Sequence, residues 1–547
     1  MGLVGIILLA TGGSRSLVTE DAHTTKHANV VRTSAGLVEG VQLTAHGRTL
    51  HAFYGIPFAE PPTGNSRFRL PTPKTPFTTV FNAKKLRAEC PQLAYTFNKE
   101  RINVSGWSED CLHLNLWTPN LLFGNESLKA VVVYLHGGGF QNGGNNLQVY
   151  DGRHFAALGD VVVVVPNYRL GIFGFLYADS AQAPGNQGLW DQRLALLWVR
   201  DNVQVFGGDP ARVTLMGQSS GSVSVGYHVL SPLTRHLFLR AIMQSGSPFY
   251  KIEENKITGP GKAKKLASRL CGTPLTWSTN AAVKCLREQS AQKLLRGVAQ
   301  LLGIKSASFV PTFGDNLVPR NPLAMMFNAT IKPVELLIGI NENEGSYFLL
   351  ELYRAMGIND PFRMSSSQHL AIMKQLMEYA LWTTPEDLMK SLLLNVREGT
   401  SIPDVVRYVA EGIGDVVVRC PTLYFSEALA NSTSRIYCYE FDYRPEKGSF
   451  RCPWMGVTHF DEFPFVWGYV FDRADLASFK DMEYSERMIR LWSSFVKNGA
   501  ISTGEETPWP HNHKEMKRCM AFRDRTQLFS MTVRRTCSVL KQYLKPQ

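Results

Sequence analysis

The sequence predicts an α/β fold with a mostly parallel central sheet flanked by helices, and three observations support this prediction. Residues 130–136 (A-V-V-V-Y-L-H), 160–166 (D-V-V-V-V-V-P) and 212–217 (R-V-T-L-M-G) are short runs that are almost continuously apolar. Such runs are typical of strands buried on both faces of a parallel sheet. Between the second and third runs, residues 186–203 carry apolar side chains at helical spacing. The order strand, helix, strand therefore predicts a sheet wrapped by helices.

The remaining elements extend this sheet in both directions. Residues 30–60 alternate short β-prone runs with glycine, which predicts antiparallel hairpins at a sheet edge. Further candidate strands follow at 239–245, 334–340 and 435–441. Residues 484–500 predict a late helix that stops at Gly499. Because the chain shows no internal repeat, low-complexity linker or break in composition, we expect one domain over residues 30–547.

The composition is that of a folded, exported protein. The 547 residues are 44% hydrophobic and 19% charged, and no stretch is long and apolar enough to span a bilayer. Residues 1–20 contain an apolar core of about 8 residues and are interpreted as a signal peptide, although no basic residues precede that core. Nine cysteines and four N-glycosylation sequons also fit a secreted protein. The sequons are at Asn103, Asn125, Asn328 and Asn431.

The positive charge is spread along the chain. The net charge is +12, but the tightest cluster is only K-A-K-K at Lys262–Lys265. Scattered charge predicts a solvated surface with no nucleic-acid site, leaving a weak attraction to anionic matrix or membrane surfaces. No cysteine lies in a C-x-x-C pair, which disfavours a zinc or thioredoxin-type site. We expect no metal and no cofactor.

A serine between two glycines follows the third apolar run. Residues 217–221 (G-Q-S-S-G) fit the pattern G-x-S-x-G between a strand and a helix, which raises the serine oxygen above the sheet. A free hydroxyl is a poor nucleophile, so Ser219 needs a base, a group that orients the base, and donors for the oxyanion. The pattern also occurs by chance. Ser219 is therefore interpreted as a nucleophile only if the rest of the chain supplies the base, the orienting group and the oxyanion donors.

Donors for an oxyanion are predicted at the end of the first run. Residues 136–140 (H-G-G-G-F) place three glycines at a strand terminus, where backbone N–H groups can turn inward. The candidate donors are the N–H groups of Gly138, Gly139 and Ser220. A plain glycine turn is the alternative interpretation, and the pairing with the serine motif at the expected chain position disfavours it.

The acid and the histidine should follow the serine in the chain. Glu342 and Glu344 lie on the loop after strand 334–340, at the end of the strand where catalytic groups collect. Four histidines lie further on, at His369, His459, His511 and His513. Glycine and apolar residues flank His459, which suits a partly desolvated site. The surroundings of Glu342 and Glu344 alone do not separate these two carboxylates.

Together these motifs resemble those of the type-B carboxylesterase/cholinesterase family, which has the α/β-hydrolase fold. Residues 206–221 (F-G-G-D-P-A-R-V-T-L-M-G-Q-S-S-G) are similar to the family's serine signature. Residues 109–119 (E-D-C-L-H-L-N-L-W-T-P) are similar to its second signature, with His113 where an aromatic residue or Thr is more usual. The resemblance covers nearly the whole chain.

The resemblance assigns roles that the residues alone leave open. It implies that Glu344, rather than Glu342, is the acid and that His459 is the base. It implies a structural ion pair between Arg67 and Glu109. It also implies the disulfides Cys90–Cys111, Cys271–Cys285 and Cys420–Cys537, and it leaves Cys438, Cys452 and Cys519 unassigned.

Three departures from the cholinesterases bear on the substrate. The first disulfide loop offers only Trp107 for holding a quaternary ammonium group, and Gln218 precedes the serine where cholinesterases carry Glu. Residues 305–311 (K-S-A-S-F-V-P) lack the set of bulky aromatics that restricts those enzymes to acetyl groups. Acetylcholine is therefore not expected as the main substrate. The residues expected to line the substrate pocket are Gln218, Phe309, Tyr347 and Phe348.

The sequence thus predicts a secreted serine hydrolase that cleaves neutral, apolar carboxylic esters through an acyl-enzyme intermediate. Ser219 would be the nucleophile, His459 the general base and Glu344 the orienting acid. One alternative is a hormone-type esterase such as those for juvenile hormone, which also carry Gln before the serine. Another is a non-catalytic, cholinesterase-like adhesion or ligand-sequestering protein. The complete set of three catalytic residues disfavours the second alternative.

Overall fold

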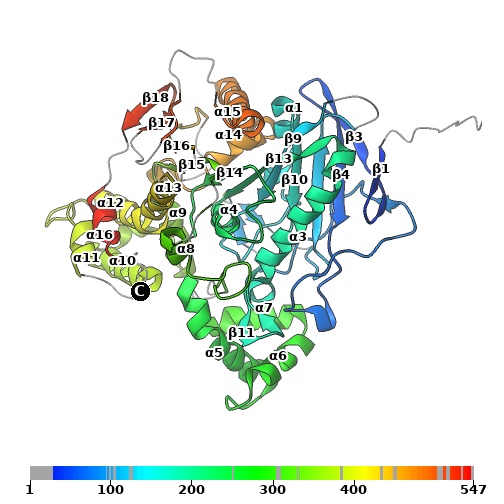
Figure 1. The fold of residues 1–547 in the computed structure, drawn as a ribbon. Helices are drawn as coiled ribbons and strands as arrows, with labels where there is room; N and C mark the ends of the chain where they lie inside the picture. The colour runs from blue at the N-terminus through cyan, green and yellow to red at the C-terminus, as the bar shows by residue number, and fades with distance from the viewer. Residues whose placement is uncertain are drawn as a thin grey trace, which may run out of the picture.

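The computed structural model describes residues 29–543 except 94, 98–99, 103–105, 122–126, 249–251, 303–308, 329–330, 332, 382–385, 431–434, 448–451, 502–508, 513–517 and 531–533. Among these residues, eleven strands form the central sheet (Figure 1). In spatial order they are β18 (Thr526–Ser530), β17 (Arg518–Phe522), β16 (Ile436–Phe441), β15 (Glu335–Asn341), β14 (Arg240–Gln244), β13 (Gly208–Gln218), β9 (Lys129–Leu135), β10 (Val162–Pro166), β8 (His113–Thr118), β4 (Arg48–Pro57) and β3 (Val41–Ala45).

The centre of the sheet is parallel and its two edges are antiparallel. Strands β10, β9 and β13 to β17 pair in parallel, whereas β8, β4 and β3 on one side and β18 on the other pair antiparallel. The apolar runs predicted as strands are the parallel ones, because a strand buried on both faces needs an apolar side chain at every position. The prediction of a mostly parallel sheet is confirmed.

Successive residues of these strands enter two separate cores. Along β10, Val162 and Val164 pack into the core on one face of the sheet, and Val163 and Val165 pack into the core on the other face. This alternation follows from the two-residue repeat of a strand. Helices α3 (Gln187–Asn202), α4 (Ser220–Leu230) and α13 (Cys420–Ala430) cover the first face, and α1 (Arg153–Gly159), α14 (Phe463–Trp467) and α15 (Phe479–Asn498) cover the second.

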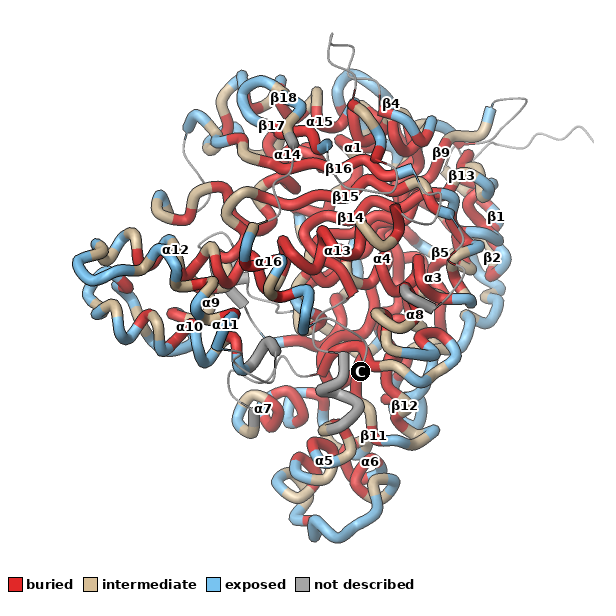
Figure 2. The backbone as a smooth tube through the Cα atoms, turned by 60° about the vertical axis from the view of Figure 1, so that its left-hand side comes forward, coloured by how far each residue is buried: buried red, intermediate tan, exposed pale blue. Residues whose placement is uncertain are grey.

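Two helical regions project beyond the sheet (Figure 2). The first, between β14 and β15, contains α5 (Ile252–Cys271), α6 (Thr279–Glu288) and α7 (Ala291–Leu302). The second contains α9 (Gly345–Ala355), α10 (Ser366–Leu381), α11 (Glu386–Leu392), α12 (Ile402–Gly414) and α16 (Arg535–Leu540). Smaller elements are β1 (Val30–Thr33), β2 (Gly36–Glu39), β5 (Phe81–Asn82), β6 (Tyr95–Phe97), β7 (Glu100–Ile102), β11 (Tyr177–Ser180), β12 (Ala183–Pro184), α2 (Gly171–Phe175) and α8 (Pro322–Asn328).

Four disulfides cross-link the described residues. Cys90–Cys111, Cys271–Cys285 and Cys420–Cys537 are present as the resemblance implied. The fourth, Cys438–Cys519, joins the neighbouring strands β16 and β17, with a Cα–Cα distance of 4.6 Å. This bond leaves Cys452 as a half-buried free thiol. The expected Arg67–Glu109 ion pair is also present, with Arg67 Nε donating to Glu109 Oε2 over 2.6 Å.

Several sequence expectations lie outside the described residues. These are the candidate signal peptide 1–20, the sequons at Asn103, Asn125 and Asn431, and the side chain of Asn328. No helix in the described part of the chain combines the length and apolar character needed to cross a bilayer. The late helix does stop at Gly499, but it begins at Phe479 rather than at residue 484, because Ser478 and Asp481 form a capping box that adds its first turn.

Candidate active site

Ser219 lies on a strained turn at the carboxyl end of β13. Its backbone φ is 57° and its ψ is −126°, a left-handed region that non-glycine residues rarely adopt. The turn is anchored to the neighbouring strand, because the Ser219 N–H donates to the Gln244 carbonyl on β14 over 2.8 Å. α4 begins at the next residue, so the serine stands between a buried strand and a helix N-terminus. Its partly exposed side chain is at the edge where the parallel strands end.

The two glycines of the motif are required by close backbone contacts. A Cβ added to Gly217 would clash with the backbone of Gly221, and a Cβ added to Gly221 would clash with the Leu135 carbonyl of β9. No side chain larger than hydrogen fits either position without moving the strand. The structure therefore gives a physical reason for the G-x-S-x-G pattern.

Glu344 and His459 form a buried hydrogen-bonded pair. His459 Nδ1 lies 2.6 Å from Glu344 Oε2, and the side chains of both residues are almost fully buried. Glu344 is at the N-terminus of α9, immediately after β15, and its other oxygen accepts from the Asn341 N–H over 2.8 Å. These contacts fix the carboxylate, which in turn fixes the imidazole ring with Nδ1 as the protonated nitrogen.

The other ring nitrogen of His459 faces the residue that precedes Ser219. Gln218 Nε2 lies 3.4 Å from His459 Nε2, so the amide donates weakly to the ring lone pair. Among the described residues, the Ser219 hydroxyl forms no hydrogen bond. The structure thus brings His459 to the serine turn, where the side chain of Gln218 contacts its Nε2.

The glycine loop 137–140 lies against the serine turn. A Cβ added to Gly137 would be 3.1 Å from Ser219 Cβ. Gly138 and Gly139 have φ values of 115° and 63°, which only glycine adopts without strain. Within the described residues their N–H groups have no acceptor. Ser220 is the first residue of α4, where N–H groups also lack partners within the helix.

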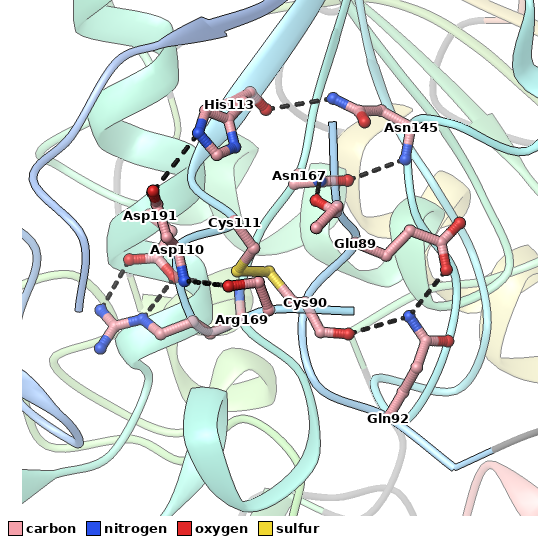
Figure 3. The surroundings of a disulfide bond; sticks show 12 residues. Glu89, Cys90, Gln92, Asp110, Cys111, His113, Asn145, Asn167, Arg169 and Asp191 are labelled. Atoms are coloured by element: carbon pink, nitrogen blue, oxygen red, sulfur yellow. Dashed lines mark hydrogen bonds and ion pairs between the residues drawn. A yellow bond between two sulfur atoms is a disulfide. The ribbon is translucent and has the colours of Figure 1, made fainter. Parts of the chain in front are cut away.

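A buried glutamine, which contacts Cys90 of the first disulfide (Figure 3), also holds the chain just beyond the glycine loop. Gln92 Oε1 accepts from the Gly143 N–H over 2.9 Å, and Gln92 Nε2 donates to the Gly143 carbonyl over 2.7 Å. The same nitrogen also contacts the Cys90 carbonyl and Glu89 Oε2, at 3.1 and 3.3 Å. Both backbone groups of Gly143 are therefore held from a segment that is cross-linked to Cys111.

Two asparagines hold the next part of the same loop. The Asn145 N–H donates to Asn167 Oδ1 over 2.7 Å, and Asn145 Nδ2 donates to the carbonyls of His113 and Val165 (Figure 3). All of these groups are buried. The chain that follows the glycine loop, at Gly143 and Asn145, is thus fixed by side-chain hydrogen bonds to β8, β10 and the disulfide segment.

The residues expected to line the substrate pocket lie around His459 and the glycine loop. The Tyr347 and Phe348 rings are centred 5.7 and 4.9 Å from the His459 ring. Phe309 is buried, and its carbonyl accepts from Gln141 Nε2 over 2.9 Å, two residues beyond Gly139. The aromatic side chains of Tyr347 and Phe348 therefore lie next to the candidate base.

The competing acid and histidines lie elsewhere. Glu342 forms ion pairs with Arg419 and Arg534, at 3.2 and 3.5 Å. Burial, together with the charge of Glu440, raises the Glu342 pKa to about 7. His369 contacts the Tyr353 hydroxyl over 2.7 Å, and the His511 ring is 6.1 Å from that of Tyr437. His513 lies outside the described residues.

Known proteins resemble this chain over most of its length. The model of the carboxylesterase family matches residues 27–539. The chain belongs to the carboxylesterase family. It is 34% identical to acetylcholinesterase-1 of Trittame loki over 497 residues, which covers 88% of each chain. It is 35% identical to the acetylcholinesterase of Danio rerio, covering 86% of this chain and 80% of the relative. The corresponding values for Bungarus fasciatus acetylcholinesterase are 36%, 86% and 78%.

Family membership makes the protein a serine hydrolase of the α/β-hydrolase fold. No group of three or more His, Cys, Asp or Glu side chains in the described part of the chain is arranged to hold a metal ion. The candidate site of this carboxylesterase-family protein brings an imidazole and a carboxylate to a serine turn and a glycine loop.

A second buried carboxylate, which sequence reasoning missed, lies behind the site of this carboxylesterase-family protein. Glu462, three residues after His459, accepts from Asn341 Nδ2 over 2.6 Å and from Gln244 Nε2 over 3.2 Å. Burial is the largest cause and the charge of Glu344 the next, and together they raise the Glu462 pKa to about 8. Glu462 is therefore protonated in the folded protein at neutral pH.

Glu462 is expected to make stability depend on pH. Its folded-state pKa of about 8 exceeds the ordinary value of 4.5, so its contribution is complete below pH 4.5 and is lost as pH rises through 8. Glu462→Gln keeps an uncharged side chain of the same size and should flatten this loss. Urea unfolding midpoints of both proteins at pH 5, 6.5 and 8 would show it. Equal pH slopes for the two proteins would contradict a protonated Glu462.

Proposed function

We propose that the protein hydrolyses neutral carboxylic esters with Ser219 as nucleophile, His459 as general base and Glu344 as the acid that orients the base. The 2.6 Å contact between His459 Nδ1 and Glu344 Oε2, with Nε2 turned toward the serine turn, is the observation that carries this proposal. The N–H groups of Gly138, Gly139 and Ser220 are the proposed oxyanion donors. Membership of a family of carboxylic ester hydrolases supports the reaction class.

The reaction proceeds in two half-reactions. Ser219 Oγ attacks the ester carbonyl carbon while its proton moves to His459 Nε2, and the carbonyl oxygen takes the negative charge. The backbone N–H donors stabilise that oxyanion, and Glu344 stabilises the imidazolium. His459 then returns its proton to the leaving alkoxide, which departs as the alcohol. Water, deprotonated by the same imidazole, attacks the acyl-enzyme and releases the acid.

The electrostatics around the serine favour a neutral substrate. Gln218 is uncharged and its amide contacts His459, so the residue that precedes the serine carries no negative charge to attract a cation. Trp107 is partly buried and packs against the hydrophobic core. The apolar rings of Tyr347 and Phe348 offer contact area rather than charge. We therefore propose apolar esters with acyl chains larger than acetyl, although the relatives named above are acetylcholinesterases.

A substrate series tests this substrate class. We expect kcat/KM for p-nitrophenyl butyrate to exceed that for the acetate by about 10-fold, because a hydrophobic pocket gains binding energy with each methylene. Acetylthiocholine should react no faster than its neutral analogue, 3,3-dimethylbutyl thioacetate. Gln218→Glu, which restores the missing charge, should shift that ratio toward the choline ester.

The control in this series is the matched pair of thioesters, which differ only in charge. A clear preference of the unchanged protein for the cationic ester would overturn the proposed substrate class without affecting the catalytic residues. Absence of turnover on every ester would overturn the enzymatic proposal itself.

We also propose that the protein works outside the cell as one domain that begins near residue 30. Four disulfides support an oxidising compartment. Glycans at the four sequons, Asn103, Asn125, Asn328 and Asn431, are part of this proposal. Peptide mass mapping of the exported protein before and after glycosidase treatment would test it.

A further inference from the structure

A short loop closed by a disulfide joins α5 and α6, the first two helices between β14 and β15. Residues 272–278 join α5 to α6, and Cys271–Cys285 ties the last residue of α5 to α6. Figures 1 and 2 both place the α5–α6 end of the protrusion away from the central sheet. We call residues 272–278 the tip loop. Its base is fixed by the cross-link and by the packing of α5 on α6.

The tip loop presents apolar side chains to solvent. Leu275 is 56% exposed and Trp277 is 44% exposed, and Pro274 beside them is also exposed. Neighbouring exposed apolar side chains on a fixed loop are typical of an interaction surface rather than of a core. Trp is also the side chain that prefers the boundary between water and lipid, because its ring is apolar and its N–H is polar.

The protrusion is strongly basic. Residues 252–302, from α5 to α7, contain nine lysines and arginines and three acidic residues, Glu253, Glu254 and Glu288. The exposed cations are Lys265, Arg269, Lys284, Lys293 and Arg296. Within the described part of the chain, none of these five side chains forms an ion pair. Among the described side chains, these five cations therefore have no carboxylate partner in an ion pair.

Two of these cations, Arg269 and Lys284, lie next to the disulfide at the base of the tip loop. Lys284 precedes Cys285, which is bonded to the start of the loop at Cys271. Arg269 Nη2 donates to Gln300 Oε1 on α7 over 3.4 Å. Lys293, Arg296 and Gln300 are all exposed and are spaced by three and four residues, so they share one face of α7 next to Arg269.

We propose that the tip loop docks on an anionic lipid surface. Leu275 and Trp277 enter the interface, and the surrounding lysines and arginines contact the lipid headgroups. The basic charge selects an anionic surface, and the exposed apolar pair selects lipid over a soluble polyanion. α5 starts beyond the carboxyl end of β14, the same edge of the sheet that carries Ser219. Docking thus turns the catalytic edge toward the phase in which apolar esters concentrate.

Vesicle binding tests this proposal with the full chain. We expect the protein to sediment with phosphatidylcholine vesicles that contain phosphatidylserine, and to bind pure phosphatidylcholine vesicles far less. Trp277 fluorescence should shift to the blue on binding. The double variant Leu275→Ser/Trp277→Ser should partition about 10-fold less, because it loses most of the apolar contact. Lys284→Gln/Lys293→Gln should weaken binding to the anionic vesicles alone.

Phe479 provides a matched control. It is 76% exposed at the start of α15, away from the protrusion, and Phe479→Ser should leave vesicle binding unchanged. Activity on a soluble ester should be unchanged in the tip-loop and control variants, which shows that they are folded. Equal binding of neutral and anionic vesicles, or no loss in the tip-loop variant, would overturn the proposal. Binding to heparin that is unaffected by Leu275→Ser/Trp277→Ser would likewise overturn it in favour of a polyanion.

Discussion

Ser219→Ala is expected to lower kcat for ester hydrolysis by about 10⁶-fold, because it removes the atom that forms the acyl-enzyme. The expected residual rate comes from the backbone oxyanion donors and from binding, which the variant keeps. A fluorophosphonate probe should label Ser219 in the unchanged protein and nothing in the variant. Steady-state kinetics and intact mass spectrometry would measure both effects.

Ser224→Ala is the matched control for Ser219→Ala. Ser224 lies one turn further along α4, and its hydroxyl donates to the Ser220 carbonyl over 3.0 Å. Loss of this hydroxyl is expected to change kcat by less than about 10-fold, since no proposed step uses it. Adding His459→Ala to Ser219→Ala should cost almost nothing more, because the two side chains act as one unit. Activity that survives in Ser219→Ala would place the nucleophile elsewhere.

Asp191→Asn is expected to lower the free energy of unfolding by about 3–5 kcal/mol, because it leaves a buried guanidinium without its counter-ion. The Asp191 carboxylate accepts from Arg169 Nε and Nη2, over 2.8 and 2.7 Å, and from the Arg169 backbone N–H (Figure 3). Both side chains are essentially inaccessible to solvent. The pair fixes the chain that follows β10 against α3.

Chemical denaturation would measure this loss as a lower midpoint at an unchanged slope. The control is the exposed ion pair Glu386–Lys390 on α11, whose disruption by Glu386→Gln should not move the midpoint measurably. A double variant, Arg169→Met with Asp191→Leu, should recover part of the stability, because no charge then stays buried alone. A midpoint for Asp191→Asn equal to that of Glu386→Gln would contradict the expected cost.

Local sequence patterns were sufficient to predict the elements that are buried on both sides. β10 and residues 130–135 of β9 are continuously apolar because both cores contact them, so their runs are visible without any knowledge of the fold. β17 was not predicted, because Arg518–Phe522 is short and carries a charge at its start. The start of α15 was also missed, because its first residue, Phe479, faces solvent and breaks the apolar period.

Contacts between distant segments account for what the sequence could not predict at the site. Ser219 and the glycine loop follow from motifs of a few residues, whose spacing is readable. Gln92 acts on Gly143, 51 residues away, and Glu462 contacts Asn341, 121 residues away. Their roles depend on which strand ends meet, and no local pattern reports that. The bond between Cys438 and Cys519 was hidden for the same reason, since it requires β16 and β17 to be neighbours.

The hydrogen bonds between Gln92 and Gly143 connect the candidate active site to the Cys90–Cys111 disulfide. Gln92 is two residues beyond Cys90, so its position depends on the bridge to Cys111. Reduction of this bridge is therefore expected to weaken the support of the chain just beyond the oxyanion-donor glycines, while the serine turn keeps its own hydrogen bond to Gln244.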